Sequence, residues 1–81
     1  MSPSVLRLVN WHSHPDQGEG APPVLHQMIC RTQGCEARSE PDTDFEAVRT
    51  WSLRHSGSNT DHREFLETIV RPWRNDPKGV A

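Results

Sequence analysis

The stretch that decides the fold reads Cys30-Arg-Thr-Gln-Gly-Cys35 and continues, after nineteen residues, with His55-Ser-Gly-Ser-Asn-Thr-Asp-His62. Two thiolates and two imidazoles form a common tetrahedral ligand set for zinc. We therefore expect Cys30, Cys35, His55 and His62 to converge on one Zn²⁺ ion with a structural role.

The spacing differs from that of a ββα zinc finger. Such a finger has about two to four residues between its cysteines, about twelve between the pairs and about three to five between its histidines. Here the gaps are four, nineteen and six residues, so only the first one fits. The long middle gap accommodates a full helix, and the last gap is too long for both histidines to share one helical face. This predicts His55 on the helix and His62 after it.

The composition favours a metal as a structural staple. The chain has 81 residues, of which 32% are apolar and 6% aromatic, with seven prolines and five glycines. These values predict a thin hydrophobic core, and chains near this size usually need a disulfide, a metal or a partner. The net charge of −2 argues against strong non-specific binding to nucleic acid, which normally requires a basic face.

The sequence also predicts the compartment. It contains no apolar run long enough for a membrane helix, and its first eleven residues are too polar for a secretory signal. We expect a cytoplasmic location, where a cysteine pair favours metal binding over a disulfide. A disulfide, or two buried thiols without metal, stays open as an alternative.

The pattern predicts an α+β fold, a small zinc-finger-like or zinc-ribbon-like domain in which three to four short antiparallel strands pack on one helix. Strands are expected at residues 5–11, 24–30 and 35–38, with a Pro/Gly-rich loop at 15–23. Gly34 supplies a positive φ to a tight turn at residues 31–34. Residues 1–73 are expected to form the single zinc-binding domain, and residues 74–81 a flexible tail.

Thr43 is the expected N-cap of the helix, because Thr43 and Glu46 have the form of a capping box. Gly57 stands where the residue after a helix belongs, so His55 falls in the last turn. The expected buried side follows helical spacing: Phe45, Val48, Trp51, Ser52 and His55. Residues 62–70 fit a helix and a strand equally well.

Three further histidines compete for the metal. His12 and His14 would point the same way in a strand, but their place before Pro15 favours solvation. His26 lies on the same strand face as Cys30 and is a possible substitute for either favoured histidine.

The Cys-x4-Cys pair, the run Phe45-Glu-Ala-Val-Arg-Thr-Trp-Ser-Leu-Arg-His55, and the later His62, Arg63 and Phe65 carry a family resemblance. The chain resembles a group of small uncharacterised actinobacterial proteins, found mostly in Streptomyces and some of their phages. The resemblance covers about residues 24–73, without the Trp-His-Ser-His stretch. It implies that the two cysteines with His55 and His62 are the ligands and that residues 62–70 form a strand. It implies no activity.

An enzyme is not expected. A catalytic zinc keeps an open position, which requires that His62 is not a ligand and that Glu64 or Glu46 acts as the base. The zinc-deaminase and His-Glu-x-x-His signatures are both absent from the sequence.

Two binding functions remain. A nucleic-acid binder would use Trp51 or Trp73 for base stacking beside a patch of arginines: Arg31, Arg38, Arg49, Arg54, Arg63, Arg71 and Arg74. Acidic residues are interspersed among them, and a helix that starts Asp42-Thr-Asp-Phe-Glu46 would meet phosphates with carboxylates. We therefore favour a protein-interaction module of unknown partner, anchored by an exposed Trp73 or Trp11; the alternative for each tryptophan is the core.

Overall fold

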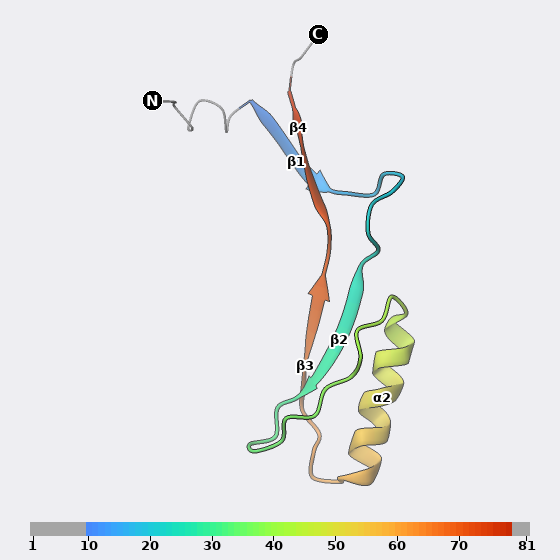
Figure 1. The fold of residues 1–81 in the computed structure, drawn as a ribbon. Coiled ribbons are helices and arrows are strands. Elements are labelled where there is room, and N and C mark those ends of the chain that lie inside the picture. The colour runs from blue at the N-terminus through green and yellow to red at the C-terminus, as the bar shows by residue number, and fades with distance from the viewer. Residues whose placement is uncertain (1–9, 79–81) are drawn as a thin grey trace. The chain divides into compact units, whose positions relative to one another are not determined.

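The computed structural model describes residues 10–78 (Figure 1). The elements follow in the order β1 (Trp11–Pro15), β2 (Leu25–Cys30), α2 (Phe45–Ser58), β3 (Phe65–Val70) and β4 (Trp73–Pro77). The strands form two antiparallel sheets of two strands each, β1·β4 and β2·β3. The α+β class is confirmed, with the strands divided between two sheets instead of joined in one.

The chain separates into two compact units. One is Pro23–Val70, which contains β2, α2 and β3, and the other combines Met1–Pro22 with Arg71–Ala81 and contains β1 and β4. The single-domain assignment of residues 1–73 stays a prediction. No helix of residues 10–78 is long and apolar enough to cross a membrane.

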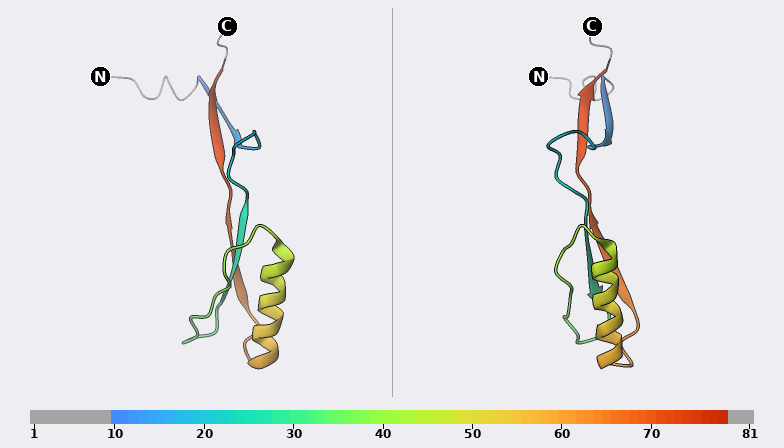
Figure 2. Two further views of the ribbon diagram at one scale, coloured as in Figure 1. Left: turned by 45° about the vertical axis from the view of Figure 1, so that its right-hand side comes forward. Right: turned by 90° about the vertical axis from the view of Figure 1, so that its right-hand side faces the viewer.

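In the unit Pro23–Val70, β2 pairs with β3 so that Leu25 lies opposite Val70 and Cys30 opposite Phe65. The helix α2 runs beside β2 in the views of Figures 1 and 2 and packs against it. Phe65–Val70 is a strand, as the family resemblance implied, and Leu25–Cys30 is the strand that the pattern predicted.

The expected third strand at residues 35–38 is wrong. Only isolated bridges join this part of the chain to β2, between Ile29 and Arg38 and between His26 and Asp42. The main-chain N–H of Met28 donates to the hydroxyl of Ser39, where a regular ladder would use a carbonyl. The side chain of Ser39 therefore interrupts the pairing, and the segment stays irregular.

The helix begins one residue later than expected. Asp44, not Thr43, is the N-cap, because its carboxylate accepts the main-chain N–H of Glu46. Asp42 in turn accepts the N–H of Asp44, which holds the cap residue in extended conformation. Asp42 and Asp44 thus satisfy two main-chain N–H groups at the start of the helix, and that of Glu46 is the one that the predicted capping box would also have satisfied.

The C-terminal end of the helix also differs from the prediction. Gly57 lies inside the last turn, and Asn59 is the C-cap, where its main-chain N–H donates to the carbonyl groups of His55 and Ser56. The side-chain amide of Asn59 donates to the His55 carbonyl as well. Asparagine therefore closes the helix, and His55 stays in the last turn as predicted.

The core of the described residues is very small. Its buried apolar side chains are Val48 and Cys30, and its buried polar side chains are Ser39 and Ser52. The helix side that carries Val48 and Ser52 is the predicted one, although Phe45 at its start is exposed. Little apolar area is removed from water, so the hydrophobic contribution to stability is correspondingly small.

In the other unit, β1 pairs with β4 in a register that places Trp11 opposite Pro77 and Pro15 opposite Trp73. The strand expected at residues 5–11 falls mainly on residues 1–9, which lie outside the described part. Residues 74–77 were expected in a flexible tail and form most of β4. Their pattern lacks apolar alternation, and an ion-pair network with β1 takes its place.

Candidate metal centre

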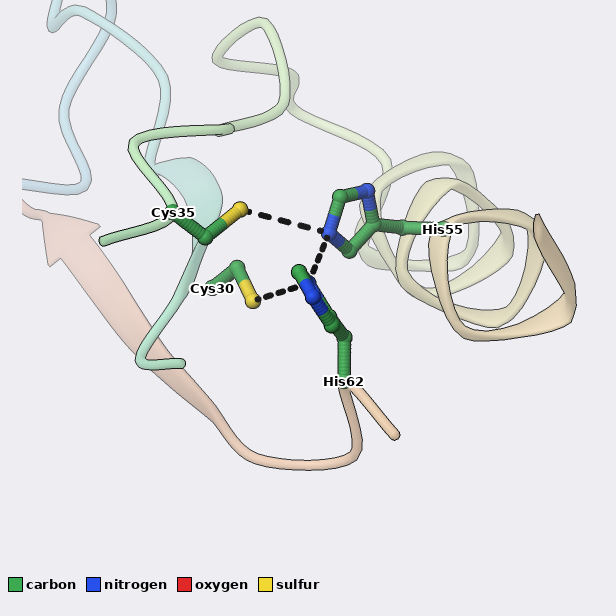
Figure 3. Close-up of side chains that lie close together, drawn as sticks. All are labelled: Cys30, Cys35, His55 and His62. Carbon is green, nitrogen blue, oxygen red and sulfur yellow. Dashed lines mark hydrogen bonds between the residues drawn. The ribbon is translucent and has the colours of Figure 1, made fainter. Parts of the chain in front are cut away.

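The four predicted ligand residues come from four different places in the unit Pro23–Val70 and point toward one another (Figure 3). Cys30 is the last residue of β2, and Cys35 follows the turn after it. His55 projects from the last turn of α2, and His62 lies in the connection between α2 and β3.

The ligand atoms of these residues lie within 4.8 Å of one another. The Sγ of Cys30 is 3.6 Å from Nδ1 of His62, and the Sγ of Cys35 is 3.6 Å from Nε2 of His55. The two ring nitrogens, Nε2 of His55 and Nδ1 of His62, are 3.2 Å apart. One atom of each side chain therefore faces a common centre.

Three of these separations match edges of a zinc tetrahedron. With Zn–S bonds of about 2.3 Å and Zn–N bonds of about 2.0–2.1 Å, a tetrahedron places sulfur and nitrogen about 3.5–3.6 Å apart and two nitrogens about 3.3–3.4 Å apart. The distances of 3.6 Å and 3.2 Å agree with these values to within about 0.2 Å, the tolerance expected of a real site. The residues present thus fit a four-coordinate metal ion.

The turn that joins the cysteines has the predicted form. Gly34 has a φ of 85°, and the main-chain N–H of Cys35 donates to the carbonyl of Thr32. The N–H of Cys30 donates to the carbonyl of Ala37, which returns the chain alongside β2. This turn brings the second sulfur back to the end of the strand, as the sequence predicted, although no regular strand follows it.

The connection between the histidines is fixed by hydrogen bonds. The hydroxyl of Ser56 donates to the carbonyl of His62, and the main-chain N–H of His62 donates to the carbonyl of Asn59. The chain therefore reverses directly after the helix. That reversal brings the two imidazoles together despite the six residues between them.

Aromatic rings hold the imidazole of His55 in place. The indole of Trp51 stacks on it, with ring centroids 5.2 Å apart and planes 10° apart. The ring of Phe65 meets both His55 and Trp51 edge to face at 6.0 Å. Trp51 lies one helical turn before His55, so the helix itself positions the stacking partner.

The sulfur of Cys30 is poised for metal binding. Its side chain is 3% exposed, and desolvation raises its pKa. Hydrogen bonds from the hydroxyl and main-chain N–H of Thr32, together with contacts to Cys35 and His55, outweigh that effect and lower the pKa to about 6. Because metals bind the thiolate, this lowered pKa favours the form of Cys30 that a metal would bind.

The competing residues lie outside the cluster. His26 is 3.1 Å from a carboxylate oxygen of Glu67, and His14 is 2.7 Å from one of Asp76. His12 packs its ring against that of His14, with centroids 5.3 Å apart. Both cysteines are free thiols in the structure. None of these three histidines belongs to the metal cluster found among residues 10–78.

The two proposed catalytic bases are engaged elsewhere. Glu46 lies 3.2 Å from Arg49 on the same helix, and Glu64 lies 3.7 Å from Arg31. Neither belongs to the four-residue cluster. These glutamates therefore serve as ion-pair partners in this structure.

A second polar network, between β1 and β4, was not predicted. The ring of His14 donates from Nε2 to Asp76 and from Nδ1 to the carbonyl of Pro15, and Arg74 donates to the other oxygen of Asp76. The hydrogen bond to Asp76 is the main cause that raises the pKa of His14, and the bond from His14 lowers the pKa of Asp76. These partners are sixty-two residues apart, so no local pattern could have revealed them.

The comparison with protein families identifies the family of the chain. A family model described as a domain of unknown function (DUF7848) matches residues 1–80, and the chain belongs to this family. The match extends beyond residues 24–73 and includes the Trp-His-Ser-His stretch that the resemblance had left out. No curated protein and no solved structure matches the chain. The actinobacterial and phage origin of its relatives stays a prediction.

Proposed function

We propose that this protein is a small interaction module whose Pro23–Val70 unit is held together by one structural Zn²⁺ bound to Cys30, Cys35, His55 and His62. The observation that carries the metal part is the match between the ligand-atom separations and a zinc tetrahedron. Four protein ligands close the site, which is the arrangement of structural and not catalytic zinc. A reducing cytoplasm is the compartment that keeps both cysteines available as thiolates.

The interaction part is supported by two exposed tryptophans. Trp11 is 43% and Trp73 59% exposed, so neither serves as core. In the β1·β4 register Trp11 faces Pro77, and Trp73 faces Pro15; because direct partners share a face and residues alternate along a strand, both tryptophans lie on the same face. Exposed tryptophans are typical anchors of protein interfaces.

Nucleic-acid binding is less well supported. Arg31, Arg49 and Arg74 each lie within 4 Å of a carboxylate, that of Glu64, Glu46 and Asp76 respectively. An arginine that is already paired offers less charge to a phosphate. Together with the net charge of −2, this pairing favours a protein partner.

Catalysis is not proposed. The cavity between residues 39–42 and α2, lined by Ser39, Glu40, Asp42, Ala47, Val48 and Trp51, has a volume of about 190 Å³. Ligand pockets commonly measure about 300–1,000 Å³. None of the four metal-cluster residues lines this cavity.

Two experiments test the proposal. Native mass spectrometry of the purified protein should show one zinc per chain, and a folded protein without metal would overturn the structural role. In affinity capture from the native host, Trp73→Ala should lose a protein partner that the wild type retains, with the fold checked by NMR. Leu53→Ala, which truncates an exposed residue on α2, is the matched control and should keep that partner. A partner lost equally in both variants would contradict the tryptophan anchor.

A further inference from the structure

The strand β3 presents an open edge. The main-chain N–H of Arg31 donates to the carbonyl of Glu64, so alternate residues of β3 make the hydrogen bonds to β2. By this alternation Leu66, Thr68 and Val70 direct their main-chain groups toward β2, whereas Phe65, Glu67 and Ile69 direct theirs away from it. No strand of residues 10–78 pairs with that outer edge.

The two edges of the β2·β3 sheet differ in whether a neighbouring segment covers them. On the β2 side, residues 38–42 supply bridges and the hydrogen bonds of Ser39 and Asp42. On the β3 side the described chain supplies no such cover, and Phe65–Val70 contains no proline or lysine. Natural edge strands that must remain single usually carry these residues or a bulge. Glu67 is the one charged residue of the strand, so among the described residues the outer edge of β3 has little protection against pairing with another strand.

Three aliphatic side chains of β3 are exposed. Leu66 is 57%, Ile69 48% and Val70 58% exposed. Trp51 and His55 of α2 contact Phe65, so the face that carries Leu66, Thr68 and Val70 is the one turned away from the helix. On that face the register joins Val70 to Leu25 and Leu66 to Ile29, with a polar Thr68–Gln27 pair between them.

The sequence of β3 is complementary to itself in one antiparallel register. If Thr68 faces Thr68 of a second copy, then Leu66 faces Val70 of that copy and Val70 faces its Leu66. The two aliphatic rows of the sheet then continue across the junction, and the polar row continues through the threonines. A junction centred on Glu67 would instead place two carboxylates directly opposite each other, which destabilises a sheet.

Charge is balanced in the same register. With Thr68 at the centre, Glu67 faces Ile69 of the second copy, and Arg71 of that copy comes level with Phe65. Arg71 and Glu67 of that copy are then both diagonal neighbours of Glu67, so the arginine offsets the repulsion between the two carboxylates. Glu67 is the charged residue of β3, and a residue of opposite sign follows directly after the strand.

We propose that this protein self-associates through the outer edge of β3, with a second copy paired antiparallel about a two-fold axis at Thr68 to form a four-stranded β2·β3·β3·β2 sheet. Glu67 and Ile69 exchange main-chain hydrogen bonds with the second copy. The inference rests on the proposed function and deepens it, because it assigns one surface and one partner to the interaction module. A six-residue strand buries less than a standard interface of about 1,600 Å², so the dimer dissociates on dilution.

Cysteine crosslinking of the zinc-loaded full chain tests the register. Residues opposite each other in a pair without hydrogen bonds have Cα atoms about 4.5 Å apart, inside the disulfide range of about 4.4–6.8 Å. Thr68→Cys should therefore form a covalent dimer under mild oxidation. Leu66→Cys alone should not, whereas a mixture of Leu66→Cys and Val70→Cys proteins should form the mixed dimer. A Leu66→Cys homodimer without the Thr68→Cys product overturns the proposed register.

Sedimentation from micromolar to millimolar concentration tests the association itself. Wild type should show a concentration-dependent dimer, and Thr68→Lys should remain monomeric because two lysines then face each other on the axis. Thr50→Lys, an exposed change on α2, is the matched control and should dimerise as the wild type does. A wild type that stays monomeric throughout, or Thr68→Lys that dimerises equally, overturns the proposal. The zinc content of each sample is measured, so a metal-free folded chain is recognised as a failure of the proposed function and not of the pairing.

Discussion

Removal of the metal should unfold the Pro23–Val70 unit. The structure allows the free energy lost with the ion to be compared with the free energy that the hydrophobic core contributes. The buried apolar side chains of the described residues are Val48 and Cys30, and full burial of a valine is worth about 1.5–3 kcal/mol. Structural zinc couples about 10–16 kcal/mol of binding to folding. A domain of this size has a stability of only a few kcal/mol, about 3–5. The free energy lost with the ion would therefore be larger than the whole stabilisation that the core contributes.

The assay is a titration of a strong chelator into the zinc-loaded protein, followed by NMR chemical-shift dispersion and by far-ultraviolet circular dichroism. The signals of α2 and of the β2·β3 sheet should collapse together, and added zinc should restore them. His55→Ala and Cys30→Ser should give the same loss without chelator. His26→Ala, which changes a histidine outside the cluster, is the control and should retain the metal.

Val48→Ala measures how much the hydrophobic core contributes to stability. It removes two methyl groups from the side chain that is 1% exposed, at a cost of about 2 kcal/mol with the cavity included. This variant should stay folded while zinc is bound. The reasoning is refuted if the chelated wild type keeps its dispersed spectrum while Val48→Ala unfolds with zinc present, because the core and not the ion would then hold the unit together.

Three further outcomes are expected. Gly34→Ala should destabilise the turn between the cysteines by about 1–2 kcal/mol, because a side chain is strained at a φ of 85°, whereas Gly57→Ala inside the helix should stabilise by about 0.5–1 kcal/mol; denaturant titrations of the two zinc-loaded variants should show opposite signs. Trp51→Ala should weaken zinc affinity roughly tenfold in a competition with a chromophoric chelator, since the imidazole of His55 loses its stacked support, and an unchanged affinity would show that the ring needs no such support. The β1·β4 pairing should be most stable between the ordinary pKa values of Asp76, 3.8, and His14, 6.5. The raised pKa of His14 gives stability that is lost as the pH rises through it, and the lowered pKa of Asp76 gives stability that is lost as the pH falls through it; an NMR titration in which Asp76→Asn leaves the pKa of His14 unchanged would contradict this coupling.

The cluster of two cysteines and two histidines could be predicted because its residue types carry their own chemistry. Thiols and imidazoles in pairs indicate a tetrahedral site wherever the chain can bring them together, and the sequence showed a turn residue at Gly34 and a helix long enough to carry His55. The distances and the choice of ring nitrogen could not be predicted. They depend on the hydrogen bonds that close the helix at Asn59 and on the bond from Ser56 to His62.

The ends of the helix were harder to predict, because hydrogen bonds from short polar side chains determine them. Asp44 displaced Thr43 as the N-cap, and Asn59 displaced Gly57 at the end of the helix. Aspartate and threonine are both good N-cap residues, and glycine and asparagine both end helices, so the local sequence offered several equivalent positions. The hydrogen bond that selects one of them belongs to the folded structure.

The strand β4 shows the opposite situation, in which an element forms without an apolar pattern. Trp73–Pro77 contains an arginine, an asparagine and an aspartate, a composition that is typical of a loop. Its pairing with β1 is accompanied by the His14–Asp76–Arg74 network, where contacts depend on charge and therefore on pH and salt. We therefore expect the Pro23–Val70 unit to respond to chelation and the β1·β4 unit to respond to pH. Measured in one protein under both treatments, their NMR signals should melt separately, and a single joint transition under either treatment would contradict this division.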